Sequence, residues 1–455
     1  MTATPHTTTA TATVAGADGG PDSVDRPGGG SGGAARLLQR VTASALGPYQ
    51  SAVIRIGFSA TYLFFLLREI PNRHELYGPD SPWHWDLARR LTEGNDAFSV
   101  LMWSDSALWF EAVYALTLLS AAGLLLGWRT RTMSVLFMVG VLSVQNRSIF
   151  MGDGGDNVIH LMAIYLVLTR CAQVWSLDAR RAARDAERRA HGLPPVRDIA
   201  GPVLWAVLGP VLLLATLMDG LGGTWWMGVL LWVLWLSAAA WWAANRRAPG
   251  GQSRLLLDVL ANLAHNATLV VIMAEVCLIY ATAGWYKIQG TRWQDGTALY
   301  YPLKLDYFTP WPALSDLLAS NALMVMVLSY ATVIVQVAFP FTLFNRRVKN
   351  VLLVVMIGEH LGIALLLGLP FFSMAMIAAD AVFLPTVFLV WLGRMVSSAR
   401  RGLLSRLSGD SRKAGGPRGP DGPSTPGGPG PAKSGGHGTE EAPPHGGSGG
   451  HTLVG

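Results

Sequence analysis

Long apolar runs dominate this sequence and limit what it can fold into. They recur between residues 50 and 395, and each is about 20 residues long, the length that an α-helix needs to cross a bilayer. The runs are continuous rather than alternating, so they indicate helices and not the strands of a membrane barrel. Charged residues make up only 14% of the chain, against about 25% in an ordinary soluble domain. The sequence therefore predicts an all-α, multi-pass protein of the cell membrane.

The apolar runs divide into about ten predicted transmembrane helices, with about eight as the lower bound. The third run is short, and a Gly-Leu-Pro turn at 368–370 separates the last two. The predicted helices lie near 49–67, 107–127, 131–146, 156–174, 201–218, 224–244, 265–286, 320–343, 350–369 and 372–393.

Arginine and lysine gather in alternate loops between these helices. Basic clusters occur at 129–131, 170–189, 246–254, 346–349 and 394–406. Positive charge marks the cytosolic side of a membrane protein, so both termini are expected in the cytosol. The long loops 68–106 and 287–319 then lie outside. The net charge of +6 reflects this topology, and no nucleic-acid partner is predicted.

The two ends of the chain differ in composition from the apolar middle. Residues 1–45 are rich in Thr, Ala and Gly, and residues 401–455 are rich in Gly, Pro and Ser. Neither segment has enough apolar surface to bury, so both are predicted to be disordered cytosolic tails. The transmembrane domain is expected at 46–400. The two cysteines, Cys171 and Cys277, lack the spacing of metal ligands, and no metal site is predicted.

A lysine closes one of the apolar runs. Lys287 follows Tyr280 and Gly284 at helical spacing, so the three residues share one face. A glycine on that face admits a neighbouring backbone or a flat ligand. A lysine beside an apolar cavity can act as a general base. The alternative is a lysine that only anchors the end of a helix at the membrane interface.

Aromatic residues are clustered in both long outer loops. The segments 79–86 and 293–311, the second beginning with Trp293, combine Trp and Tyr with Pro and Asp. Trp and Tyr favour the membrane interface. The loops therefore either cap a cavity between helices or form an aromatic belt with no site beneath it.

Other polar residues interrupt the apolar runs. Asp156, Asn157 and His160 open the fourth predicted helix. They either cap that helix or form a functional polar cluster in which Asp156 and His160 pair across one turn. Arg55, in the first predicted helix, either meets a partner or polar cavity or extends to the lipid headgroups.

Two ionisable neighbours, Glu359 and His360, fall in the middle of the ninth predicted helix. Adjacent helical residues point about 100° apart, so each is expected to find a separate partner. Charges at that depth are rarely a packing feature, and a role in proton handling or ligand binding is expected.

These residues together resemble the HTTM family, the horizontally transferred transmembrane domain related to vitamin K-dependent gamma-carboxylase. The resemblance covers roughly residues 46–400. The residues that carry it, in order, are Arg55-Ile-Gly57, Arg68–Arg73, Gly123–Arg131, Asp156-Asn157, Tyr280–Lys287 with Trp293, and His360 with Gly368 and Phe371.

The resemblance implies a role for the lysine. In the carboxylase, the matching lysine is implicated as the base that acts on vitamin K hydroquinone, and Lys287 would be that base here. The carboxylase has a histidine directly after its Asn-Asn pair, whereas Val158 follows Asp156-Asn157 in this chain. It also carries a folded extracytoplasmic region after its last span, where this sequence has a Gly/Pro-rich segment.

Two functions are predicted from these observations. The first is a membrane protein that binds a quinone-like lipid, such as menaquinone or vitamin K, in an outward-facing cavity, and that acts on a small peptide or protein substrate if it is an enzyme. The second is a non-enzymatic transport, export or immunity factor associated with a peptide toxin. The predicted catalytic residues are Lys287, His360, Asp156 and Asn157, and the predicted ligand-binding residues are Arg55, Tyr280, Gly284, Trp293, Glu359 and His160.

Overall fold

The computed structural model describes residues 31–194, 196, 198–221, 225–248 and 250–413. Within these ranges the chain forms helices, turns and loops, without a strand. The predicted all-α class is confirmed for this part of the chain. The chain divides into two compact units, Met1–Arg394 and Met395–Gly455, and the first unit holds every predicted site residue.

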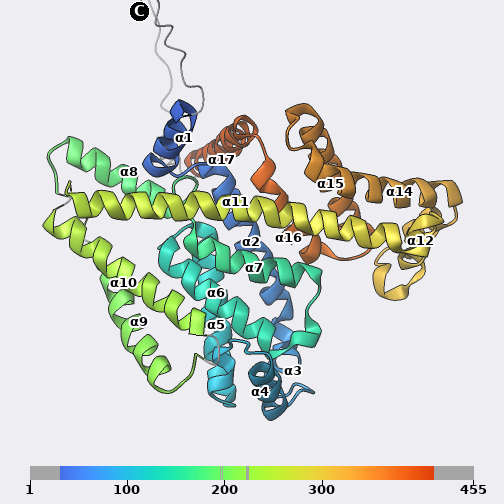
Figure 1. The fold of residues 1–455 in the computed structure, drawn as a ribbon, viewed down its shortest axis with the longest axis horizontal. Helices are drawn as coiled ribbons and strands as arrows, with labels where there is room; N and C mark the ends of the chain where they lie inside the picture. The colour runs from blue at the N-terminus through green and yellow to red at the C-terminus, as the bar shows by residue number, and fades with distance from the viewer. Residues whose placement is uncertain (1–30, 195, 197, 222–224, 249, 414–455) are drawn as a thin grey trace, which may run out of the picture. The chain divides into compact units, whose positions relative to one another are not determined.

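The described residues of the first half form ten α-helices joined mostly by short connections (Figure 1). Their bounds are α1 Ser31–Ala43, α2 Pro48–Glu69, α3 Arg73–Leu76, α4 Trp85–Gly94, α5 Ala107–Leu126, α6 Thr130–Arg147, α7 Gly154–Leu168, α8 Leu177–Ala190, α9 Ala200–Leu217 and α10 Trp225–Arg247.

The second half begins with the long helix α11. The bounds are α11 Gln252–Gln289, α12 Thr291–Gln294, α13 Pro312–Ala319, α14 Ala322–Ala338, α15 Arg346–Leu366, α16 Pro370–Asp380 and α17 Thr386–Lys413. Short 3-10 turns lie between the helices of both halves, at η1 Ile70–Asn72, η2 Val100–Trp103, η3 Ile149–Met151, η4 Ala298–Tyr300, η5 Pro302–Lys304, η6 Asp306–Phe308, η7 Phe339–Thr342 and η8 Ala381–Phe383.

Seven helical segments of the described residues are long and apolar enough to cross a membrane. They are Pro48–Leu76, Ala107–Leu126, Ala200–Leu217, Trp225–Arg247, Gln252–Gln289, Ala322–Thr342 and Arg346–Leu366. Two shorter apolar stretches, Gly154–Leu168 and Pro370–Phe383, occupy two more of the predicted positions.

The last predicted span, 372–393, is not one helix. Helix α16 and the turn η8 end at Phe383, Leu384 is extended at φ −65° and ψ 136°, and α17 begins at Thr386. Pro385 explains the break, because the residue before a proline is driven out of the helical region. The sequence analysis missed this boundary.

Helix α2 lies at the centre of the first unit, packed against α5, α7 and α16. Small residues allow its closest approach: a Cβ at Gly57 would collide with the Cβ of Ala378 in α16. Leu66, Tyr62 and Phe58 of α2 are fully buried in the core. Helix α2 is therefore a tightly packed central helix against which α7 and α16 are placed.

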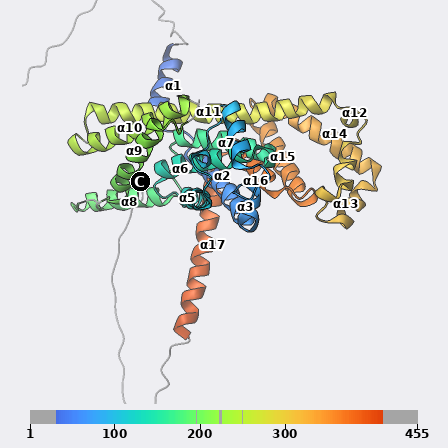
Figure 2. The ribbon, with the colours of Figure 1, turned by 90° about the horizontal axis from the view of Figure 1, so that it is seen from below.

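Helix α11 has 38 residues and runs past most of the other helices of the first unit, as two views of the ribbon agree (Figures 1 and 2). It extends beyond the predicted span 265–286 at both ends. Its last turn contains Lys287, as the sequence predicts for the end of a span.

Part of the predicted N-terminal disordered tail is helical. Residues Ser31–Ala43 form α1, and α17 continues to Lys413 in the predicted C-terminal tail. The side-chain amides of Asn262 and Asn266 in α11 donate to the backbone carbonyls of Thr42 (2.9 Å) and Val41 (2.8 Å). These long-range hydrogen bonds hold the end of α1, and the sequence of the tail alone does not predict them. Residues 1–30 and 414–455 of the predicted tails lie outside the described residues.

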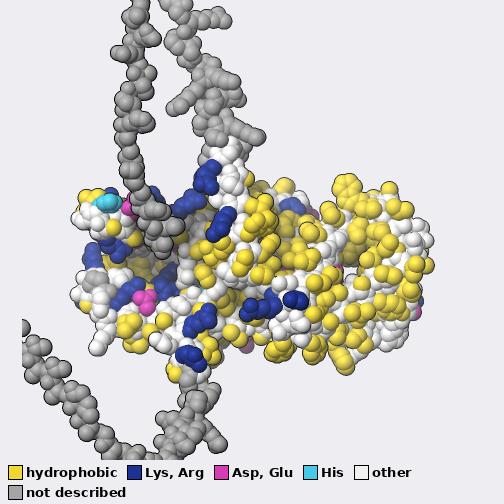
Figure 3. All heavy atoms as spheres, turned by 90° about the horizontal axis from the view of Figure 1, so that it is seen from above, with side chains coloured by type: hydrophobic (Ala, Val, Ile, Leu, Met, Phe, Trp, Pro, Cys, Tyr) yellow, Lys and Arg dark blue, Asp and Glu magenta, His cyan; other side chains and the backbone are white. Residues whose placement is uncertain are grey.

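The surface of the first unit is uneven in chemistry. Figure 3 shows hydrophobic side chains over the part formed by α12–α15, while most of the Lys and Arg side chains on this face lie away from it. Phe341 and Ile334 are examples of large apolar side chains exposed in this part. Such a surface is unusual for a protein in water and is expected of one that faces lipid.

Candidate functional site

Three buried polar side chains meet between α11, α15 and α16. The hydroxyl of Tyr280 lies 3.0 Å from Nε2 of His360 and 3.0 Å from each carboxylate oxygen of Asp380. These residues are only 2%, 2% and 0% exposed, so water does not satisfy them. When the hydroxyl proton points to Asp380, Nε2 of His360 donates to the phenol oxygen. Nδ1 of His360 has no partner among the described residues.

A second chain of polar groups starts at Lys287. Its Nζ donates to Oε1 of Gln336 in α14 (2.8 Å), and Nε2 of Gln336 donates to Oε1 of Glu359 in α15 (2.6 Å). Gln336 is 5% exposed and links the Lys287 amine to the Glu359 carboxyl group. Nζ of Lys287 also lies 5.3 Å from the centre of the Trp293 ring, which is within cation–π range.

The predicted shared face of Tyr280, Gly284 and Lys287 is confirmed. A Cβ at Gly284 would lie 2.5 Å from Cγ2 of Val337 and 3.3 Å from its backbone nitrogen. Gly284 thus admits the neighbouring helix α14, the first of the two roles predicted for it. This close approach brings Gln336, the residue before Val337, within reach of Lys287.

Glu359 and His360 find separate partners, as the 100° step between adjacent helical residues predicts. Glu359 accepts from Gln336, whereas His360 meets Tyr280. The two polar chains are therefore neighbours, built on successive residues of α15.

The start of α7 is capped in the manner that the sequence suggested. The Asp153 side chain accepts from the backbone N–H groups of Gly155 (2.6 Å) and Asp156 (3.1 Å), and the Asp156 side chain accepts from the N–H of Asp153 (2.9 Å). This reciprocal arrangement is a capping box. Asp156 therefore has a structural task at the helix start.

The predicted pair between Asp156 and His160 does not form directly. Gln145 of α6 lies between them: its Nε2 donates to the backbone carbonyl of Asp156 (3.1 Å), and its Oε1 lies 3.1 Å from Nδ1 of His160. A second helix thus supplies the amide that links the two residues, and sequence spacing within α7 could not show it.

A cavity of about 410 Å³ opens beside this cluster. Its aromatic walls are Tyr62, Phe65 and Tyr77, and its polar lining is Gln145, Asn146, Ser148, Asp156, Asn157 and His160. The hydroxyl of Tyr62 is fully buried and has no hydrogen-bond partner among the described residues. A buried hydroxyl without a protein partner in a cavity wall can form a hydrogen bond to a bound molecule.

The rim of the cavity includes one exposed apolar residue, Ile149 of η3, which is 43% exposed. Phe150 and Met151 follow it in η3 and are 60% and 40% exposed, but they do not line the cavity. Tyr77 belongs to the segment 68–106, which the sequence predicts as the first outer loop, but it lies outside the aromatic cluster 79–86. Trp293 and the rest of the segment 287–319 are not among the residues that line the cavity. A capping role for the two aromatic clusters stays a prediction.

Phe372 separates the cavity cluster from the buried triad. Its ring lies 5.7 Å from that of His360, and its backbone would meet a Cβ at Gly155 at 2.8 Å. The predicted site residues therefore fall into two groups. Asp156, Asn157 and His160 surround the cavity, while Lys287, Tyr280, Glu359 and His360 belong to the polar chains behind Phe372.

Arg55 belongs to neither group. Its guanidinium is fully buried and donates to four backbone carbonyls, those of Leu124 (2.5 Å), Leu125 (2.9 Å), Trp175 (2.9 Å) and Cys171 (3.2 Å). It thus satisfies the free carbonyls at the end of α5 and in the turn after α7. Arg55 therefore meets partners, the first of the two alternatives predicted for it, and they are backbone carbonyls rather than lipid headgroups. A ligand contact of Arg55 stays a prediction.

Three functional candidates were missed by the sequence analysis. Asp380 stands alone in an apolar run, and the rarity of intramembrane carboxylates could have singled it out. Gln336 and Tyr62 are uncharged, and nothing in their local sequence separates them from other polar residues of apolar helices.

Comparison with known proteins adds no relative: no protein-family model, no curated protein and no solved structure matches the chain. The resemblance to the HTTM family therefore rests on the residues quoted above and stays a prediction.

Proposed function

We propose that this chain is a multi-pass membrane protein of the HTTM type that binds the head group of a quinone-like lipid. The cavity beside α7 carries the proposal. Its volume of about 410 Å³ lies within the usual range for small-molecule sites, about 300–1,000 Å³. Its walls are aromatic, which suits a flat ring, and the exposed Ile149 at its rim suits the isoprenoid tail.

The polar lining of the cavity fits the two oxygens of a quinone ring. The unpartnered hydroxyl of Tyr62 and the side-chain amide of Asn157 can each donate to a carbonyl oxygen. His160 lies on the same wall, where Gln145 fixes the orientation of its ring. These are contacts that a quinone would complete, since the protein leaves the Tyr62 hydroxyl unused.

Binding is tested by extracting lipid from the purified protein and identifying quinone by mass spectrometry. Tyr62→Phe removes only the unpartnered hydroxyl, so we expect the same folding stability and about three- to tenfold weaker quinone binding, the worth of one hydrogen bond. Tyr165→Phe, on α7 but outside the cavity lining, is the matched control. If the native protein holds no quinone and takes up none when it is added, the proposal fails.

Lys287 is proposed as a base by its resemblance to the carboxylase lysine. A neutral Lys287 amine would take a proton from a hydroquinone hydroxyl and leave the hydroquinone anion. Gln336 accepts a hydrogen bond from the amine and donates one to Glu359. The neighbouring Tyr280–His360–Asp380 triad contains further groups that can hold a proton. Lys287 does not line the cavity, so this role needs the head group to sit against α11 and α14.

Loss of quinone binding and loss of proton transfer by Lys287 can be measured separately. We expect Lys287→Ala to retain quinone but to lose any acceleration of hydroquinone oxidation by dissolved oxygen, measured as oxygen uptake. Equal oxygen uptake by the native protein and Lys287→Ala would remove the base from the proposal and leave quinone binding intact.

A non-enzymatic role as a transport, export or immunity factor is the second candidate. It is favoured by the burial of the triad, since side chains 0–2% exposed reach no ligand without rearrangement. Neighbouring genes separate the two: a quinone or redox operon favours the first, and a small secreted peptide favours the second.

The proposed topology has about ten spans, with both termini in the cytosol and the chain in the cell membrane. The alternating basic loops support it. Under this topology the start of α7 and the end of α11 both face outward, so the cavity and Lys287 share one side. Thiol labelling from outside tests this in a cysteine-free background: Asp295→Cys should react, and Ser398→Cys should not.

A further inference from the structure

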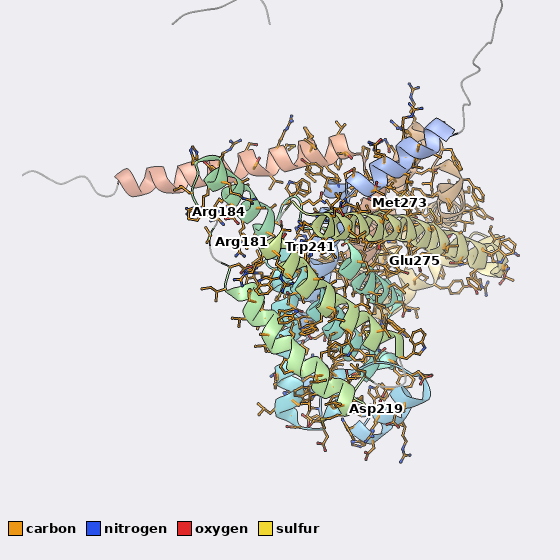
Figure 4. All side chains as sticks on the ribbon, turned by 60° about the vertical axis from the view of Figure 1, so that its left-hand side comes forward. Arg181, Arg184, Asp219, Trp241, Met273 and Glu275 are labelled. Atoms are coloured by element: carbon orange, nitrogen blue, oxygen red, sulfur yellow. The ribbon has the colours of Figure 1, made fainter. Side chains whose placement is uncertain are left out.

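Three arginines surround one tryptophan, Trp241, near the C-terminal end of α10. The guanidinium carbons of Arg131, Arg254 and Arg170 lie 4.1, 4.4 and 5.7 Å from the centre of the Trp241 ring. They come from the starts of α6 and α11 and from the turn after α7. Figure 4 shows Trp241 on the same side as Arg181 and Arg184 of α8, away from Asp219 in the turn before α10.

The cluster carries more positive than negative charge. Asp258 pairs with both Arg170 (3.2 Å) and Arg254. Arg131 has no ion pair or hydrogen bond from its side chain to any described residue, although the side chain stacks on Trp241. Asp258 is therefore paired with two of the three guanidinium groups, and the third has no paired carboxylate in the described part of the chain.

The arginines act on one another. Arg170 and Arg254 repel the charge of Arg131, and only the carboxylates of Asp258 and Asp178 oppose them. The Asp178 carboxylate already accepts a hydrogen bond from the backbone N–H of Thr130 at the start of α6 (2.8 Å). A cluster of like charges attracts anions from solution.

The other two arginines are fixed in position. Arg170 donates to Asn262 (2.6 Å), and Arg254 donates to Asn245 (2.7 Å). Two oriented guanidinium groups and one unpaired group match the oxygens of a phosphate, which arginine binds through paired N–H donors. Trp241 is half-buried near a helix end, a usual position at the membrane interface.

We propose that Arg131, Arg170 and Arg254 around Trp241 bind the phosphate group of an anionic phospholipid. Basic pockets between transmembrane helices on the cytosolic side are suited to such head groups. The inference goes beyond quinone binding and rests only on the chain spanning a membrane. The same chemistry would hold free phosphate, so the test must separate the two sources.

The test uses the full chain in phosphatidylcholine nanodiscs with increasing phosphatidylglycerol, and native mass spectrometry to count retained lipids. Arg131→Gln removes the unpaired charge without breaking a polar contact to a described residue. We expect phosphatidylglycerol to bind on the order of fivefold more weakly, the worth of one interfacial arginine. Arg131→Lys keeps the charge but loses the paired donors, and it should bind with intermediate affinity.

Arg247→Gln is the matched control, because Arg247 is exposed at the end of the same helix but is not part of the cluster. Equal loss in Arg131→Gln and Arg247→Gln, or no loss in either, would overturn the proposal. Retention of phosphatidylcholine as strongly as phosphatidylglycerol would do the same. Displacement of the lipid by millimolar inorganic phosphate in the native protein, but not in Arg131→Gln, would support a phosphate site and name free phosphate as its ligand.

Two further measurements keep the outcome distinct from quinone binding. Quinone content should be unchanged in Arg131→Gln, and phosphatidylglycerol binding should be unchanged in Tyr62→Phe. A thermal unfolding midpoint close to that of the native protein shows that Arg131→Gln is folded, so that its lost lipid reports the site.

Discussion

The Tyr280 hydroxyl lies 3.0 Å from both carboxylate oxygens of Asp380, although the two residues are 100 positions apart in the chain. Asp380 is fully buried, and the Tyr280 hydroxyl is the one side-chain donor found for it among the described residues. A buried carboxyl that loses its donor pays the full desolvation penalty. The hydrogen bond therefore connects α16 to α11, and no other described side chain supplies Asp380 with a donor.

Removal of this hydroxyl should weaken the fold. We expect Tyr280→Phe to lower the free energy of unfolding by about 1–3 kcal/mol, because it leaves Asp380 and His360 without their shared partner. The measurement is denaturant unfolding in detergent. Tyr286→Phe is the control, since Tyr286 lies on the same helix and is 73% exposed. Equal stability of the two variants would contradict the role assigned to the triad.

Lys287 and Glu359 should be energetically coupled through Gln336. In a double-mutant cycle with Lys287→Ala and Glu359→Ala, we expect an interaction energy of about 0.5–3 kcal/mol, as for residues that share one network. Lys304→Ala with Glu359→Ala is the control pair, because Lys304 is bound to Asp316 in the outer loop. Additive effects in the Lys287 cycle would show that the amide bridge transmits no energy.

The close contact of α11 with α14 makes Gly284 intolerant of a side chain. Gly284→Ala should destabilise by about 1–3 kcal/mol, because its methyl group would press on Val337 at 2.5 Å. Gly358→Ala, in α15, has no atom within 4 Å of the new methyl group, and the change should be neutral or stabilising. A lower thermal midpoint for Gly358→Ala than for Gly284→Ala would refute the packing argument.

Acid should break the ion pair between Asp198 and Arg129. Burial opposes ionisation of Asp198, but hydrogen bonds from the Arg129 side chain and the Gly201 N–H outweigh it and lower its pKa from 3.8 to about 2. A lowered pKa stabilises the fold above the ordinary value, and that stability is lost as the pH falls through the lowered one. The native protein should therefore exceed Asp198→Asn in stability at pH 6 but not at pH 2.

Salt provides the control for this effect. Asp198 is 41% exposed, so the difference at pH 6 should shrink as the ionic strength rises. A stability difference between the native protein and Asp198→Asn that is the same at pH 6 and pH 2 would show that the ion pair is not its source.

Features that depend on helical spacing could be predicted from the sequence. The shared face of Tyr280, Gly284 and Lys287 and the divergence of Glu359 from His360 follow from the 3.6-residue period alone. The capping box of Asp153 and Asp156 follows from residue preference at helix starts. Each of these needs only the residues of one helix.

Features that depend on contacts between helices could not be predicted. Gln145 lies on α6 and Gln336 on α14, yet each completes a chain of polar groups that begins on another helix. The partners of Arg55 could not be predicted for the same reason, since its four carbonyl partners follow it in the chain by 69 to 120 residues. A sequence shows that a buried charge needs partners, but the fold decides which ones it finds.

Helix α11 also has a mechanical consequence. Asn262 and Asn266, in the first half of the helix, bond to the end of α1, and Lys287 lies in its last turn. The distance from Asn266 to Lys287 is roughly 32 Å along an unbroken helix. A rod of that length turns a small tilt at the two asparagines into a larger displacement at the lysine. A movement of α1 would thus reach Lys287 through leverage rather than through a relay of side chains.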